Sequence, residues 1–90
     1  MRDTAKKILK LRRLVKAFKN ETKDHILASY VDGYLNEAYD AKDCFEIYIG
    51  FAKERIAQRI EILTRDAENN GEEFIHEAAY IKLLEEFETI

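Results

Sequence analysis

The chain has 90 residues, of which 47% are hydrophobic and 37% charged, with three glycines and no proline. This length allows one small domain, and the shortage of glycine and proline argues against turn-rich β-sandwiches and barrels. A single cysteine excludes a disulfide framework, and no apolar run reaches the roughly 18 residues of a membrane span. We therefore expect a single all-α domain over residues 1–90.

The net charge of −3 is distributed unevenly along the chain. Residues 1–19 carry eight basic side chains and one acidic one, whereas residues 72–90 carry six acidic side chains and one basic one. Charged residues interrupt every apolar run near the N-terminus, so this segment does not resemble a secretory signal. Together with the lone Cys44, this pattern predicts a cytoplasmic protein.

Residues 4–19 have the period of an amphipathic helix, with Leu9 expected at the surface. The expected core face consists of Ile8, Leu11, Leu14, Val15 and Phe18. Six basic residues on the opposite side form what we call the basic ridge: Lys6, Lys10, Arg12, Arg13, Lys16 and Lys19. Such a ridge suits the phosphates of a nucleic acid, an anionic membrane, an acidic protein or the acidic remainder of this chain.

A second apolar stripe runs from Ile26 to Ala67 in steps of three and four residues. A turn would normally shift the phase of such a stripe, so the pattern predicts one long helix over about 22–68. We expect any bend near 40, where Asp40 could cap a following helix, or near Gly50. The sequence Asn69-Asn70-Gly71 predicts a helix end, and Asn70 with Glu73 resembles a capping box for a last helix over 72–88.

An unbroken helix of this length would extend about 70 Å, whereas a folded domain of this size is about 32 Å across. The preferred interpretation is therefore a three-helix chain that assembles as a dimeric helical bundle. A chain that breaks near Asp40 would instead form a monomeric four-helix bundle.

Two sets of apolar residues are candidates for contact with a second copy or another protein. The first follows the central stripe: Tyr30, Tyr34, Phe45, Tyr48, Ile49, Ile56, Ile60 and Leu63. The second is a separate strip formed by Cys44, Ile47, Phe51 and Ile62. Tyrosine is enriched at interfaces, although tyrosines at helical spacing also serve as ordinary core residues.

No pattern of catalytic residues stands out. Ser29, the only serine, lies in no nucleophile motif, and there is no glycine-rich phosphate loop. Glu73 and His76 have the Glu-x-x-His spacing of di-iron helical bundles, but a capping Glu followed by a surface His explains the same pattern. We expect no enzyme, no catalytic residue, no metal and no cofactor.

The sequence therefore predicts a small regulatory or adaptor protein that acts through helix-mediated protein–protein contact as a homodimer. One alternative is a nucleic-acid-binding regulator that uses the basic ridge. A second alternative is a di-metal bundle that uses Glu73 and His76. The sequence names no particular partner.

Overall fold

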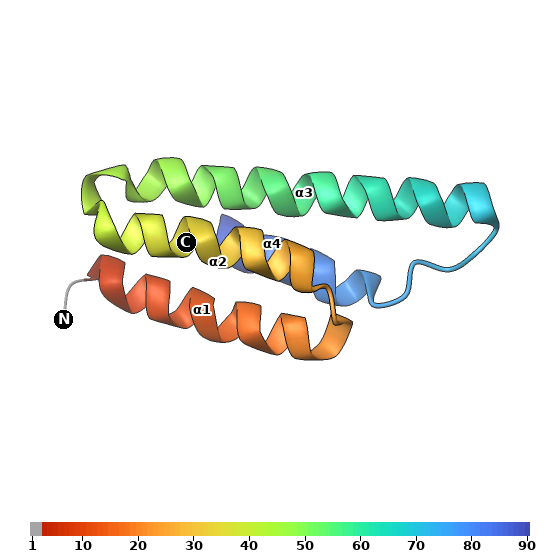
Figure 1. The fold of residues 1–90 in the computed structure, drawn as a ribbon, viewed down its shortest axis with the longest axis horizontal. Coiled ribbons are helices and arrows are strands. Elements are labelled where there is room, and N and C mark those ends of the chain that lie inside the picture. The colour runs from red at the N-terminus through yellow and green to blue at the C-terminus, as the bar shows by residue number, and fades with distance from the viewer. Residues whose placement is uncertain (1–2) are drawn as a thin grey trace.

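The computed structural model describes residues 3–90, so Met1 and Arg2 of the expected single domain lie outside the described residues. All regular structure in this range is helical, which confirms the all-α class. The elements are α1 (Asp3–Thr22), α2 (His25–Asp40), the short 3-10 helix η1 (Lys42–Cys44), α3 (Phe45–Asn70) and α4 (Glu77–Glu88). The four α-helices run alternately up and down (Figure 1). Each of α1 and α3 packs against both α2 and α4, which gives a four-helix bundle.

The predicted continuous helix over 22–68 is wrong, and with it the three-helix chain. α2 ends at Asp40, Ala41 leaves the helical conformation (φ −118°, ψ 77°), and η1 turns the chain back into α3. The break lies beside Asp40, as in the four-helix alternative, but no side chain caps the start of α3. Residues 41–44 are about as many as one helical turn contains. The three- and four-residue spacing of apolar residues in the sequence therefore continues across the corner without a shift.

The chain is also too short for its length to require a dimer. The described chain measures 47 × 21 × 21 Å, with a radius of gyration of 13.5 Å. α3 is the longest helix, and its C-terminal part projects beyond the other three (Figure 1). A second copy is therefore not needed to cover an unbroken central helix, and any case for a dimer must come from the surface of the bundle.

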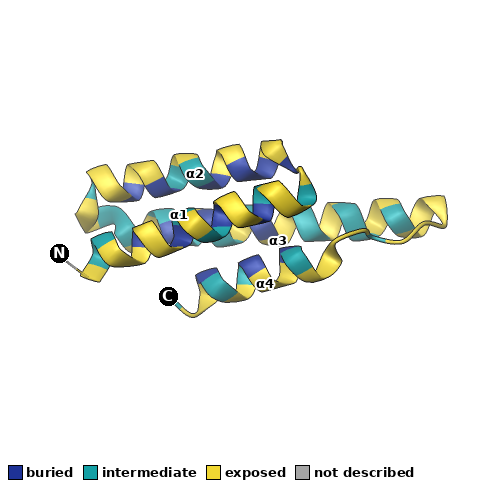
Figure 2. Cartoon of the chain, turned by 90° about the horizontal axis from the view of Figure 1, so that it is seen from below, coloured by how far each residue is buried: buried dark blue, intermediate teal, exposed yellow. Residues whose placement is uncertain are grey.

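The core is formed by one face of each α-helix (Figure 2). The prediction for α1 is confirmed, because its buried residues Ile8, Leu11, Val15 and Phe18 belong to the expected face and Leu9 is exposed. In the α2 part of the predicted stripe, Ala38 is buried, as expected, but Ile26 and Tyr30 are exposed. α2 also buries Leu27, Ala28, Val31 and Leu35, which lie on one side of that stripe, and α4 buries Tyr80, Leu83 and Phe87.

Two predicted helix ends are confirmed, at Gly71 and at residue 88, and other predicted ends differ from the structure. α1 continues to Thr22 instead of ending at residue 19, and α2 begins at His25, capped by Asp24. The capping box over Asn70 and Glu73 is wrong, because α4 begins only at Glu77.

Gly71 ends α3 in the left-handed conformation, with φ 65°. The N–H of Glu72 donates to the carbonyl of Ala67 at 2.8 Å, and the N–H of Gly71 donates to that of Glu68 at 3.3 Å. These two bonds form a Schellman motif and satisfy carbonyls that the helix end would otherwise leave free.

Two glycine substitutions should change the free energy of unfolding in opposite directions. Gly71→Ala should lower it by about 1 kcal/mol, because alanine is strained at positive φ. Gly50→Ala should raise it by about 1 kcal/mol, because Gly50 lies inside α3 and an added Cβ meets no atom within 4 Å. Urea denaturation of the two variants checks this, and a shift of the same sign in both would contradict it.

Candidate functional site

The basic ridge of α1 is divided between two neighbouring helices. The Arg12 guanidinium donates a hydrogen bond to Oδ1 of Asn36 on α2 and lies 5.8 Å from the ring centroid of Tyr39. On the other side, Nζ of Lys10 lies 3.9 Å from a carboxylate oxygen of Glu86 on α4. Part of the ridge therefore holds α1 against its neighbours, while Lys6, Arg13 and Lys16 are exposed to solvent.

A shallow groove follows the junction of α1 and α2 beside the ridge. It is lined by Arg12, Lys16, Lys19, Asp32 and Asn36. Partial burial raises the pKa of Asp32, and the positive charges of Lys19 and Arg12 offset this rise only in part. The groove thus contains its own carboxylate, which weakens it as a site for an anion.

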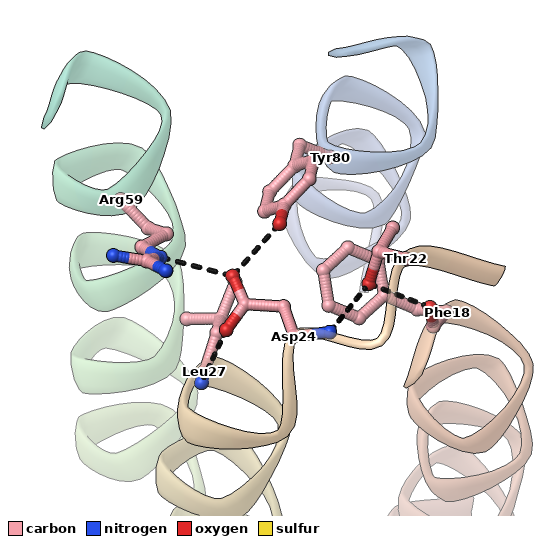
Figure 3. A network of polar contacts seen from close by, with 6 residues as sticks. All are labelled: Phe18, Thr22, Asp24, Leu27, Arg59 and Tyr80. Atoms are coloured by element: carbon pink, nitrogen blue, oxygen red, sulfur yellow. Dashed lines mark hydrogen bonds and ion pairs between the residues drawn. The ribbon is translucent and has the colours of Figure 1, made fainter. Parts of the chain in front are cut away.

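The most buried charge in the described chain is Asp24, in the turn between α1 and α2 (Figure 3). Oδ1 of Asp24 accepts a hydrogen bond from the N–H of Leu27 at 3.1 Å and so caps α2. Oδ2 accepts from Nε of Arg59 on α3 at 2.9 Å and from the hydroxyl of Tyr80 on α4 at 2.8 Å. One carboxylate therefore ties together three helices and the turn that follows α1.

Thr22, the last residue of α1, holds the backbone of Asp24 in place. Its hydroxyl donates to the carbonyl of Phe18 at 2.9 Å and accepts from the N–H of Asp24 at 3.2 Å. The Phe18 ring packs edge-on against the Tyr80 ring, with centroids 4.8 Å apart. The polar cluster is thus flanked on one side by aromatic rings, and it serves the fold because its groups are already paired with one another.

The bonds around Asp24 change two pKa values in opposite directions. Burial alone would raise the pKa of Asp24, but the bonds from Arg59, the Leu27 N–H and Tyr80 outweigh burial and lower it. Burial, together with the bond to the Asp24 carboxylate, raises the pKa of Tyr80 to about 12. The folded state therefore favours a charged Asp24 and a neutral Tyr80.

The raised pKa of Tyr80 predicts a loss of stability at alkaline pH. The stabilisation is complete below the pKa of an unfolded tyrosine, near pH 10, and is lost as the pH rises through about 12. Tyr80→Phe should flatten the dependence of unfolding free energy on pH in this window, and it should remove an ionisation near pH 12 from the ultraviolet titration. An unchanged titration would contradict this assignment.

Aromatic and apolar side chains join α2 and α3 on the outside of the bundle. The Phe51 ring lies 5.8 Å from the rings of both Tyr34 and Tyr48. The Arg55 guanidinium lies 4.2 Å from the centroid of the Tyr30 ring and donates a hydrogen bond to the Tyr34 hydroxyl at 3.4 Å. These contacts make one continuous surface across the two helices.

Isoleucines extend this surface at both ends. Ile47 precedes Phe51 by one helical turn, and Ile62 follows Arg55 by two turns on the same face of α3. The ion pair between Asp24 and Arg59 holds the start of α2 beside the second half of α3. Ile26 therefore lies at the same end of this surface as Ile62. We call this surface the α2–α3 strip; it consists of Ile26, Tyr30, Tyr34, Ile47, Tyr48, Phe51, Arg55 and Ile62.

Five large apolar side chains of the strip are about half exposed to solvent or more. The exposed fractions of its least buried apolar members are 66% for Ile26, 49% for Tyr30, 55% for Ile47, 46% for Phe51 and 47% for Ile62. Single exposed apolar residues are common on proteins, but a continuous patch of several hundred Å² usually marks an interaction site.

The structure divides the predicted contact residues between core and surface. Ile49 and Ile56 are buried inside the bundle and contact the chain's own helices, so they are not available to a partner. Five more are partly buried and pack against the same core: Phe45, Ile60, Leu63 and also Tyr34 and Tyr48. Only Tyr30, Tyr34 and Tyr48 belong to the strip, and the other strip residues were absent from the first predicted set.

The structure does not place Glu73 and His76 as a di-metal site of a helical bundle would require. Glu73 and His76 lie in the segment between α3 and α4 and not on a helix, so they are not one helical turn apart. Nδ1 of His76 lies 3.9 Å from a carboxylate oxygen of Glu21. Residues 3–90 contain no cluster of three or more His, Cys, Asp or Glu placed to hold a metal ion.

Comparison with known proteins adds no further guide to function. No protein-family model, curated protein or solved structure matched the chain. Across residues 3–90, no helix has both the length and the apolar character needed to cross a membrane. We therefore infer the function from the residues of this chain alone.

Proposed function

We propose that this chain is a small regulatory or adaptor protein of the cytoplasm that binds another protein through helix–helix contact and is not an enzyme. The observation that carries the proposal is that five of the nine large exposed hydrophobic residues of the described chain lie along the outer side of α2 and α3, in the α2–α3 strip. Aromatic residues and arginine are enriched at protein interfaces, and both are present at the centre of the strip.

The strip is not needed to fill the core. Fifteen buried hydrophobic residues from all four α-helices already form one cluster. The exposed members of the strip project away from that cluster and leave apolar surface in water, which is unfavourable by about 25 cal/mol per Å². Binding of a partner's apolar helix face would recover this free energy, so the strip suits recognition better than folding.

Site-specific photocrosslinking tests the proposal. A photoreactive phenylalanine analogue replaces Ile47 in the strip or, as a control, the comparably exposed Ile81 on α4. In lysate of the native host, we expect the probe at 47 to give a discrete adduct larger than the 10.6 kDa chain, and the probe at 81 to give none. Equal labelling from both positions, or no adduct from position 47, would contradict the proposal.

Nucleic-acid binding through the basic ridge is a second candidate function. Its support is that Lys6, Arg13 and Lys16 remain exposed and form no ion pair with the described residues. If this function holds, Arg13→Glu with Lys16→Glu should abolish retention on immobilised duplex DNA at low salt, because each lost phosphate contact weakens binding. Lys53→Glu on α3 is the control, and unchanged retention of the double variant would exclude the candidate.

A further inference from the structure

We propose that the occupant of the α2–α3 strip is a second copy of this chain, so that two closed bundles form a dimer about a two-fold axis. This inference rests on the proposed function, because it takes the strip to be the binding face. It differs from a dimer built on one long shared helix, since each chain keeps its own four-helix core. The same strip would lie on both sides of the interface, as two-fold symmetry requires.

The area of the strip matches what a dimer needs. A whole aromatic side chain has about 150–250 Å² of surface, so the exposed halves of Tyr30 and Phe51 offer about 100 Å² each. With a somewhat smaller contribution from each of the three isoleucines, the apolar area is about 450 Å² per copy. A standard interface buries about 800 Å² per partner, of which a little more than half is apolar. The strip therefore supplies the apolar part of one such interface.

The charges beside the strip allow two copies to meet. Glu37 and Glu54 are exposed next to it, and the partly buried Arg55 lies beside them, whereas Arg59 is already paired with Asp24 of its own chain. Across a two-fold axis, Arg55 of each chain could meet a glutamate of the other, so opposite charges would pair twice. The outer face of α1 offers no such pairing, because two basic ridges would repel each other.

The shape of the strip also favours a second copy. It follows an antiparallel helix pair from Ile47 to Ile62, which is about 22 Å of helix length. α2 and α3 have α1 and α4 behind them, so the outer side of this pair is a long helical surface free of other elements (Figures 1 and 2). Two such surfaces, packed against each other, would give a further layer of helix packing between the copies.

Sedimentation equilibrium over a range of concentrations tests the inference on the whole chain. We expect the wild-type protein to approach twice the 10.6 kDa chain mass as its concentration rises. Ile47→Glu and Phe51→Glu should each weaken association at least tenfold, because each would bury a charge in the apolar interface. Ile81→Glu, an equally drastic change at a similarly exposed site on α4, should leave association unchanged.

Two variants guard against a folding artefact. Phe51 contacts Tyr34 and Tyr48, so Phe51→Glu could also disturb the fold. Its association is therefore compared with that of the wild type only if its circular dichroism shows the same helix content. Ile47 is more exposed, and Ile47→Glu tests the same face with less risk to the fold. Equal weakening by Ile81→Glu, or no weakening by either strip variant, would overturn the inference.

The inference and the proposed function can fail separately. A wild-type chain that stays monomeric at all concentrations, but forms an adduct with a different protein through position 47, would overturn the second copy and retain the binding function. A monomeric chain that forms no adduct through position 47 in host lysate would overturn both.

Discussion

Phe87→Ala is expected to lower the free energy of unfolding by about 4 kcal/mol, the largest single effect that we foresee. Phe87 is the largest fully buried side chain of the described residues and lies on α4, which packs against α1 and α3. α4 has only 12 residues, and a helix of this length is marginal in water without tertiary packing. Loss of the ring should therefore release much of α4 along with opening a cavity.

Urea denaturation and hydrogen exchange check this prediction together. We expect a lower unfolding midpoint and a selective loss of amide protection in α4. Ile81→Ala on the same helix is the control, and because Ile81 is exposed it should change the unfolding free energy by less than about 1 kcal/mol. Equal losses in the two variants would contradict the placement of α4.

Asp24→Ala is expected to lower the free energy of unfolding by about 3 kcal/mol. The substitution removes the cap of α2, which contributes about 1 kcal/mol, and leaves the buried Tyr80 hydroxyl without its acceptor. It also removes the ion pair with Arg59, whose side chain is partly exposed and adds less than a fully buried partner would. Asp40→Ala, at an exposed site, should change stability by less than about 0.5 kcal/mol.

A double-mutant cycle of Asp24→Asn and Arg59→Met separates the charge from the cap. Asparagine can still cap the helix through Oδ1, and its amide nitrogen can donate to the Tyr80 hydroxyl, so Asp24→Asn should lower the free energy of unfolding less than Asp24→Ala. Arg59→Met alone should lower the free energy of unfolding more than Arg59→Met combined with Asp24→Asn. The single variant leaves a buried carboxylate without its cation, and the double variant does not. Additive single effects would show that the ion pair contributes nothing.

The lowered pKa of Asp24 gives this cluster a dependence on pH. Its stabilisation is present above the ordinary carboxyl pKa, near pH 4, and is lost as the pH falls through the lower pKa of the folded state. The difference in unfolding free energy between the wild type and Asp24→Asn should therefore shrink below about pH 4. A difference that stays constant from pH 7 to the acid transition would contradict the assigned charge.

Periodicity predicts a helix well where one helix has one buried face. α1 shows this, since its core face and its exposed Leu9 both follow from spacing alone. The same reasoning gave the corner between α2 and α3 only as the alternative to one long helix, because the four residues from Ala41 to Cys44 preserve the phase of the stripe. Phase shows which residues share a face, but not whether the chain continues straight or folds back.

The sequence indicates the α3 part of the candidate site but not the α2 part, because spacing alone does not show which helices pack together. Ile47, Phe51 and Ile62 already stand out as an apolar strip apart from the main one, but α2 had to pack antiparallel to α3 before Tyr30 and Tyr34 could join them. The Asp24 cluster was less visible still, because Arg59 and Tyr80 lie 35 and 56 residues away along the chain. Only the capping role of Asp24 has a local signal, namely its position just before a helix.

Our central claim is that one chain closes its own four-helix bundle and leaves the α2–α3 strip as a binding surface. Small-angle X-ray scattering with an absolute mass, measured on Phe51→Glu, tests it most directly. We predict a mass of 10.6 kDa, a radius of gyration close to 13.5 Å and a longest dimension close to 47 Å. A particle of about 70 Å, the length of an unbroken helix over 22–68, would contradict the closed bundle and with it the exposed strip.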